Sequence, residues 1–154
     1  MMTMIGNSHA ALGRKRLAHD YFDLDWRTYR EVLGVEHAGT YVAAFNYADS
    51  LISIKKCAKA AYFLREWIAR AVDIFGPDFQ YTLDLRHALA RALHEDPRAS
   101  QDALIEALAI LEELEPKMRK IYGNSHPHTR ENREYLEGAR MRREDIDAGI
   151  YSLD

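Results

Sequence analysis

This chain of 154 residues has little of what several protein classes require. It contains one cysteine, Cys57, which excludes an intrachain disulfide and a zinc site built from several thiolates. It has no apolar run near the roughly 20 residues that span a bilayer. The first residues, MMTMIGNSHAALGRKR, lack the apolar stretch of a signal peptide. We therefore expect a cytoplasmic protein with no membrane insertion.

Turn-forming residues and excess charge are also scarce. With only 4 prolines and 8 glycines, the sequence predicts a helical chain without a low-complexity linker. The formal net charge of −3 gives no general attraction to nucleic acid, so we expect no nucleic-acid partner. The length and a hydrophobic content of 47% suffice for one domain with a sizeable core.

A short phrase occurs three times along the chain. The copies read LGVEHAGT, FGPDFQYT and YGNSHPHT, and they end at Thr40, Thr82 and Thr129. The threonines follow one another after 42 and then 47 residues. A period in this range is typical of helical repeats, which stack on their neighbours and form extended binding surfaces.

The segments between the phrases read as helices. Apolar residues recur at steps of three and four, and Gly76-Pro77 is a strong stop signal. Thr40 and Thr82 are predicted N-caps, and Pro116 predicts a kink. The first and last helices lack a partner in this interpretation. The predicted helices cover residues 10–33, 40–54, 58–75, 83–93, 103–122 and 126–146.

These residues resemble the tetratricopeptide repeat, and specifically the 42-residue repeats of kinesin light chains. The likeness covers about residues 17–141, with departures at Lys55 and Pro97, which replace the turn glycine, and at Glu137, which replaces a small residue. The matching positions are Thr40, Asn46, Ala48, Leu51, Ala60 and Gly76, and then Thr82, Leu83, Leu89, Ala90, Leu93, Gly123, His126, Pro127 and Thr129.

The resemblance implies an all-α fold, a right-handed α-solenoid of antiparallel helix pairs with about six helices. The repeat domain is expected over 10–146, between a flexible N-terminus (1–9) and a C-terminal tail (147–154). In the family, the first helix of each helix pair lines the concave face, and these helices usually hold a peptide. The residues that this implies for peptide binding are Phe45, Asn46, Asp49, Asp84, His87, Arg91, His94 and Glu134.

Three of these residues suggest specific roles toward a peptide. Phe45 would be an aromatic platform, His87 a titratable donor, and Arg91 a fork for a carboxylate of the ligand. The alternative is a solvated helix face with ordinary charge pairs one turn apart. Asn46 is equally compatible with packing between repeats.

Other candidate sites are weaker. His126 and His128, and the run from His94 to Asp96, do not have the spacing of a metal site, so no metal or cofactor is expected. Cys57 is interpreted as a structural, semi-buried residue rather than a thiol activated by nearby lysines.

No catalytic motif stands out, so we expect no enzyme activity. The predicted function is a protein-protein interaction adaptor that binds a peptide or helix on its concave face. Two alternatives remain. One is a self-assembling structural subunit that associates through its unpaired terminal helices, with a dimer favoured. The other is a regulatory fragment of a larger enzyme.

Overall fold

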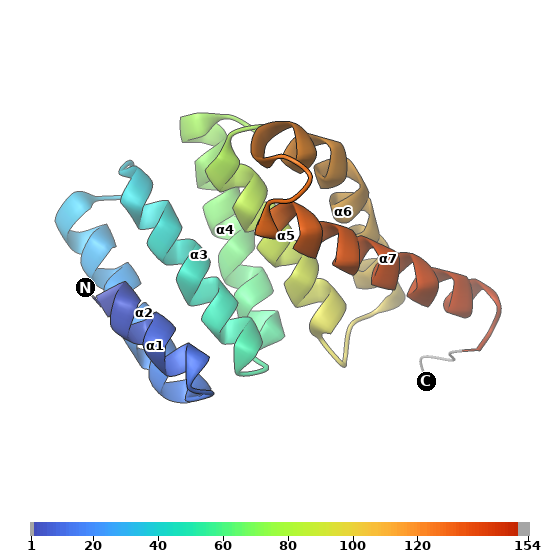
Figure 1. Ribbon diagram of the computed structural model, residues 1–154, viewed down its shortest axis with the longest axis horizontal. Coiled ribbons are helices and arrows are strands. Elements are labelled where there is room, and N and C mark those ends of the chain that lie inside the picture. Colours follow the sequence, from blue (N-terminus) through green and yellow to red (C-terminus); the bar gives the residue numbers. More distant parts are fainter. Residues whose placement is uncertain (1, 151–154) are drawn as a thin grey trace.

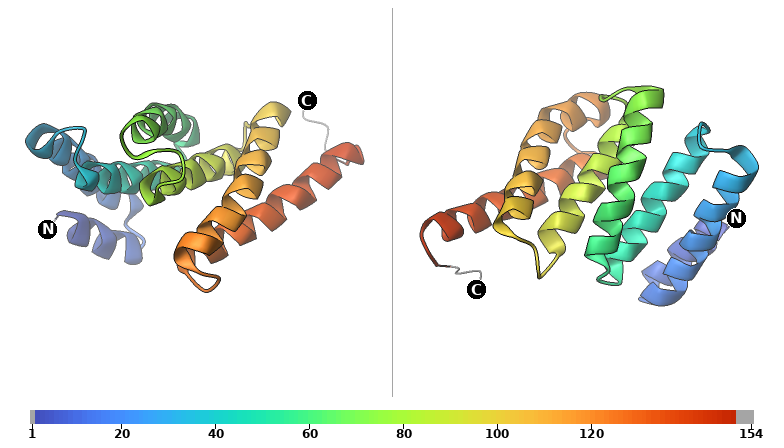
Figure 2. Two further views of the ribbon diagram at one scale, coloured as in Figure 1. Left: turned by 90° about the horizontal axis from the view of Figure 1, so that it is seen from above. Right: turned by 180° about the vertical axis from the view of Figure 1, so that it is seen from behind.

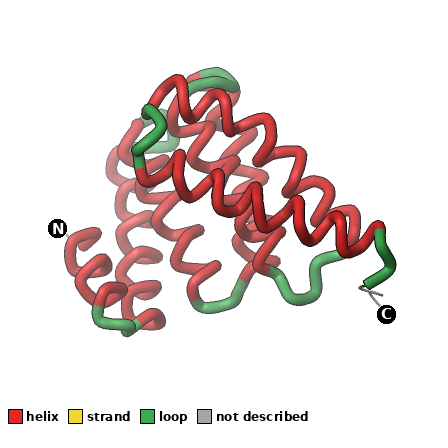
Figure 3. Tube along the Cα trace, turned by 45° about the vertical axis from the view of Figure 1, so that its right-hand side comes forward, coloured by secondary structure: helices red, strands yellow, loops and turns green. Residues whose placement is uncertain are grey.

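The structure is a computed structural model that describes residues 2–150, all of them in helices, turns or loops (Figure 3). Its seven helices form a stack in which each helix packs on the next (Figure 1). The predicted all-α solenoid is confirmed, with seven helices where about six were expected. The helices are α1 (Met2–Ala11), α2 (Lys15–Leu33), α3 (Ala38–Ser53), α4 (Cys57–Phe75), α5 (Gln80–Glu95), α6 (Gln101–Tyr122) and α7 (Pro127–Asp147).

The helices form three pairs and a final single helix. The first helices of the pairs are α1, α3 and α5, and α7 occupies the same place in a fourth unit. Helix α3 packs directly on α5, and α5 packs on α7. Seen from above (Figure 2, left), α1 and the start of α7 lie on one side of the stack and α4 lies on the other. The side bounded by α1 and α7 is the concave face.

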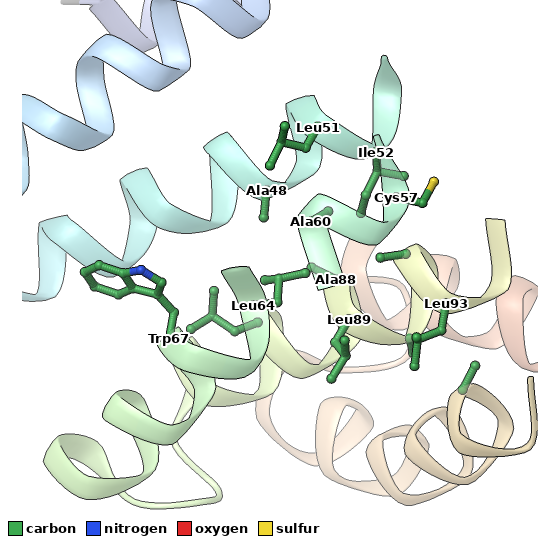
Figure 4. Close-up of a cluster of buried hydrophobic side chains, with 14 of the residues drawn as sticks. Ala48, Leu51, Ile52, Cys57, Ala60, Leu64, Trp67, Ala88, Leu89 and Leu93 are labelled. Atoms are coloured by element: carbon green, nitrogen blue, oxygen red, sulfur yellow. The ribbon is translucent and has the colours of Figure 1, made fainter. Parts of the chain in front are cut away.

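The core is a continuous cluster that extends from α3 to α7, and Figure 4 shows its part around α3, α4 and α5. Ala48, Ala60 and Ala88 are fully buried, and their small side chains let the helix backbones approach closely. Leu51 and Leu64 fill the space between them, and a fully buried leucine contributes about 1.5–3 kcal/mol relative to an exposed one.

The threonine of the repeated phrase has a different role from the predicted N-cap. Helix α3 begins before Thr40, whose buried hydroxyl donates to the carbonyl oxygen of Gly34 at 2.7 Å. Thr82 donates to the carbonyl oxygen of Gly76 at 2.8 Å in the same way. Both glycines end a helix with positive φ, 82° and 94°. The threonine therefore fixes the angle between one repeat and the next by satisfying a carbonyl that the helix leaves unpaired.

The N-terminal prediction is wrong in two respects. Residues 2–9, expected to be flexible, belong to α1, and the helix expected over 10–33 begins at Lys15. Helix α1 packs on α2 through Gly6, where a Cβ would lie 2.8 Å from the ring of Phe22. Helix α2 therefore has a preceding partner. The predicted tail starts at the last residue of α7, and residues 151–154 lie outside the described part.

The predicted kink at Pro116 and the departure from the repeat pattern at Lys55 have different outcomes. Helix α6 continues through Pro116 to Tyr122. Lys55, in the turn where the family has glycine, adopts a φ of 63° and is the one non-glycine residue with positive φ among residues 2–150. A side chain with a Cβ is strained in this left-handed region.

We predict that Lys55→Gly increases the free energy of unfolding by about 0.5–1 kcal/mol, because glycine adopts this conformation without strain. The exposed pair that Lys55 makes with Glu95, at 3.5 Å, contributes little. Urea denaturation measures the change. Lys56→Gly is the control, since Lys56 has a φ of −96° and gains nothing from glycine. An unchanged or lower stability of Lys55→Gly would contradict the prediction.

Candidate functional site

The predicted site residues lie on α3, α5 and α7, which are the first helices of three successive units and pack side by side. Phe45, Asn46 and Asp49 are on α3, Glu134 is on α7, and the other four are on α5. Two polar clusters join most of them across the helix boundaries. Asn46, which is half-buried, belongs to neither cluster.

The first cluster is centred on Arg91. Its Nη1 atom lies 2.6 Å from Asp49 Oδ1 on α3 and 3.4 Å from Glu131 Oε1 on α7, and its Nη2 lies 3.8 Å from Glu95 Oε1. The side chain is 12% exposed. Burial disfavours its charge, but the carboxylates of Asp49 and Glu131 outweigh this effect and raise the pKa of Arg91. The guanidinium also packs over the ring of Tyr135, 5.5 Å from its centroid.

Arg91 therefore differs from its predicted role. Its terminal nitrogens point at carboxylates of this chain, so they hold α3, α5 and α7 together. The geometry favours a structural cation over a fork for a ligand's carboxylate. An Arg91→Glu substitution would place a fourth carboxylate among three, so it would report on folding rather than on binding.

His87 is part of the same cluster and lies inside the protein, with only 2% of its surface exposed. Its Nδ1 is 3.0 Å from Asn132 Oδ1, while the Asn132 amide nitrogen donates to the Leu111 carbonyl at 3.2 Å. His87 Nδ1 therefore carries the proton in this arrangement. Its Nε2 faces Glu131 Oε2 at 3.7 Å, beyond hydrogen-bonding distance. The side chain links α5 to α7 and is not the surface donor that was predicted.

The second cluster joins the other ends of the same helices. The carboxylate of Asp84 accepts a hydrogen bond from the Tyr122 hydroxyl at 2.9 Å and lies 3.1 Å from His128 Nδ1. The ring centroids of His128 and Phe45 are 5.9 Å apart. The bond to Asp84 raises the pKa of His128, against the opposing effect of burial. Phe45 and Asp84 are thus brought together through a histidine that was not among the predicted residues.

His94 and Glu134 line a surface pocket of about 360 Å³ together with Glu131 and Tyr135. The rings of His94 and Tyr135 meet edge to face, with centroids 5.7 Å apart, and burial lowers the pKa of His94. Glu134 is exposed. This pocket is where the predicted residues are most accessible to a ligand.

The remaining candidates have structural environments. Cys57 is buried, and burial raises the pKa of its thiol, which fits a structural cysteine. His126 caps α7, because its Nδ1 accepts from the backbone N–H of His128. Within residues 2–150, no group of three or more His, Cys, Asp or Glu side chains is placed to hold a metal ion. None of the described helices combines the length and the apolar character needed to cross a membrane.

One feature had no signal in the sequence. A pocket of about 330 Å³ lies between the start of α6 and the end of α7, with Leu104, Ile105 and Ala139 among its lining residues. Arg142 borders it and donates to the carbonyl oxygen of His94 at 2.9 Å. The residues of this pocket are far apart in the chain, and only the packing of the last two helices brings them together.

Comparisons with known proteins agree with this architecture. A family model described as tetratricopeptide repeat matches residues 1–39, which include α1 and α2. The family model therefore recognises the N-terminal unit, which was expected to lack its first helix. A search of curated proteins gives no match.

Solved structures give the same result over nearly the whole chain. The nearly identical TPR-like repeats of a candidate kinesin light chain from Podosopora anserina superpose with a TM-score of 0.78 at 16% identity, covering 96% of this chain and 67% of that one. A single-substitution variant of the same protein gives a TM-score of 0.78 at 17% identity, with the same coverage of both chains. The predicted resemblance to tetratricopeptide repeats, and to those of kinesin light chains, is confirmed. At this identity it establishes the fold alone.

The pair formed by Asp84 and His128 predicts a pH dependence. Because Asp84 raises the pKa of His128, the folded state favours the protonated imidazole. This stabilisation is fully present below the ordinary histidine pKa of about 6.5, and it is lost as the pH rises through the raised value. We expect Asp84→Asn to lower the pKa of His128 and to flatten the pH dependence of unfolding above about pH 6.5.

NMR titration of the His128 ring measures this pKa directly. Asp78→Asn is the control, because Asp78 pairs with Lys117 at 2.6 Å and makes no contact with His128. A His128 pKa that is the same in Asp84→Asn and in the unchanged protein would contradict the assignment.

Proposed function

We propose that this protein is a non-enzymatic protein-interaction module that binds a peptide segment on its concave face, across α3, α5 and α7. The observation that carries the proposal is the accessible part of that face. Phe45, Glu134 and the pocket beside His94 all lie on helices that pack side by side. Tetratricopeptide repeats generally mediate contacts between proteins, which agrees with this use of the face.

The two polar clusters support this proposal through rigidity. Arg91 and His87 tie the three helices together beneath the surface, so the spacing of the accessible side chains is set before a partner arrives. A preformed face lowers the entropy that binding costs. A segment lying across several parallel helices would contact one or two side chains from each of them.

Selection from an unbiased displayed peptide library against the full chain tests the proposal. For a selected peptide, we expect Phe45→Ala to raise Kd about thirtyfold, which corresponds to about 2 kcal/mol for a truncated aromatic anchor. The matched control is Tyr62→Ala on α4, a helix on the opposite side of the stack, where the ring is 79% exposed. Thermal unfolding checks that both variants fold.

Two outcomes would contradict the proposal. One is that selection yields no peptide. The other is that Phe45→Ala and Tyr62→Ala weaken binding equally, which would place the contact away from the concave face.

We also propose that the chain forms a dimer through its N-terminal end. On α2, Leu17 and Leu24 lie two turns apart on one side of the helix and are 41% and 51% exposed. Exposed apolar stripes favour association. Contact between like ends closes a dimer by two-fold symmetry.

At the other end of the stack, Met141 of α7 is 66% exposed, but other apolar side chains of this helix are covered. Leu136 and Ala139 of α7 are buried, and Arg133 and Arg140 pair with glutamates of α6 at 3.6 and 3.2 Å. The proposal of a dimer through like N-terminal ends is therefore favoured over head-to-tail assembly.

Leu24→Glu should convert a dimer into a monomer, because it places a charge in the apolar contact. Tyr21 of the same helix is a poorer position for this substitution, because its ring stacks on His9 of its own chain. Light scattering over a wide concentration range measures the mass, with Tyr62→Glu as the control. A monomer mass at every concentration of the unchanged protein would refute the dimer.

A further inference from the structure

Acidic side chains dominate the concave face. Counted over α3, α5 and α7, the carboxylates of the two clusters and of the pocket are Asp49, Asp84, Glu95, Glu131 and Glu134. The cations nearby are Arg91 in the centre, Lys55 at the edge beside Glu95, and Arg130 one helical turn before Glu134. His128, beside Asp84, adds a further positive charge when it is protonated. The small net charge of the whole chain conceals this local excess.

We infer that the partner segment bound on the concave face is basic and presents arginine or lysine side chains to these carboxylates. The inference rests on the proposed function, and it adds the chemistry of the peptide. Charge complementarity between an acidic face and a basic segment selects the partner and speeds its association.

The centre of the face has one cation for several carboxylates. Asp49 and Glu131 both approach the same Arg91 nitrogen, and their side chains remain 40% and 37% exposed. His87, whose Nε2 lies 3.7 Å from Glu131 Oε2, and the charge of Arg91 hold the pKa of Glu131 below its usual range, so this group is ionised at neutral pH. Both carboxylates are therefore partly open to solvent, and a second cation beside them would relieve their mutual repulsion.

The adjoining pocket repeats the chemistry that already holds Arg91. Inside the protein, the guanidinium of Arg91 lies between carboxylates and over the ring of Tyr135. The pocket offers the carboxylates of Glu131 and Glu134 together with the rings of Tyr135 and His94. A planar guanidinium both pairs with a carboxylate and stacks on an aromatic ring, so arginine fits this pocket best.

An acidic segment would find few cations available on this face. The terminal nitrogens of Arg91 are directed at Asp49, Glu95 and Glu131, and the side chain is mostly buried. Arg142 is bound to the carbonyl of His94. Arg130 and Lys55 at the margins, and His128 when it is protonated, would face the added negative charge, and the carboxylates between them would repel it.

Fluorescence anisotropy with the full chain tests the charge preference. The probes are two labelled peptide pools of equal length, identical except that arginine or glutamate occupies the charged positions. We expect the arginine pool to bind at least about tenfold more tightly, a difference of about 1.4 kcal/mol. Added salt should weaken this binding, because it screens exposed charges.

Charge reversal at two positions of α7 locates the contact. Glu134→Lys should weaken binding of the arginine pool about tenfold, because it places a like charge in the pocket. Glu137→Lys makes the same change in net charge on the same helix, but Glu137 is exposed outside the pocket, on the side from which Arg133 and Arg140 reach α6. It should leave the affinity nearly unchanged.

Each other outcome overturns the inference. If the glutamate pool binds more tightly and Phe45→Ala abolishes that binding, the concave face still binds peptides, but the inference of a basic partner is wrong. Equal losses in Glu134→Lys and Glu137→Lys would mean that the arginine pool responds to net charge alone. If neither pool binds while library peptides still depend on Phe45, the inference fails and the proposed function stands.

Discussion

A buried guanidinium must be compensated by carboxylates, and in this chain that requirement connects the three helices of the concave face. Arg91 comes from the middle helix, and its partners come from α3 on one side and α7 on the other. If one carboxylate moves away, the remaining contacts must carry a charge that water no longer solvates. The curvature of the face is therefore tied to an electrostatic balance as well as to apolar packing.

The apolar core and the threonine contacts also hold the helices in their relative positions. Alanines at the helix crossings bring α3, α4 and α5 close together, and the hydroxyls of Thr40 and Thr82 fix each turn to the helix before it. The side chains of the face then project from a rigid support. Rigidity of this kind suits a surface that recognises the spacing of charges on another chain.

The sequence predicted the parts of this structure that depend on local pattern. Apolar periodicity and the spacing of the phrases indicated α3 to α7, because those signals arise within one helix or one turn. Helix α1 was missed, since its short and weakly amphipathic segment is stabilised by Gly6 fitting against Phe22. The positions of His87 and Arg91 were predicted but their roles were not, because burial and ion pairing depend on which neighbours the fold brings to them.

The salt bridge between Asp49 and Arg91 joins residues that are 42 positions apart, which is one repeat length. The two side chains therefore occupy equivalent places in successive units, and they carry opposite charges. Two copies of either unit placed in tandem would set like charges against each other at this place. The units are consequently not interchangeable, because their order determines whether opposite or like charges meet. Duplication or shuffling of a single unit during evolution would therefore be electrostatically unfavourable.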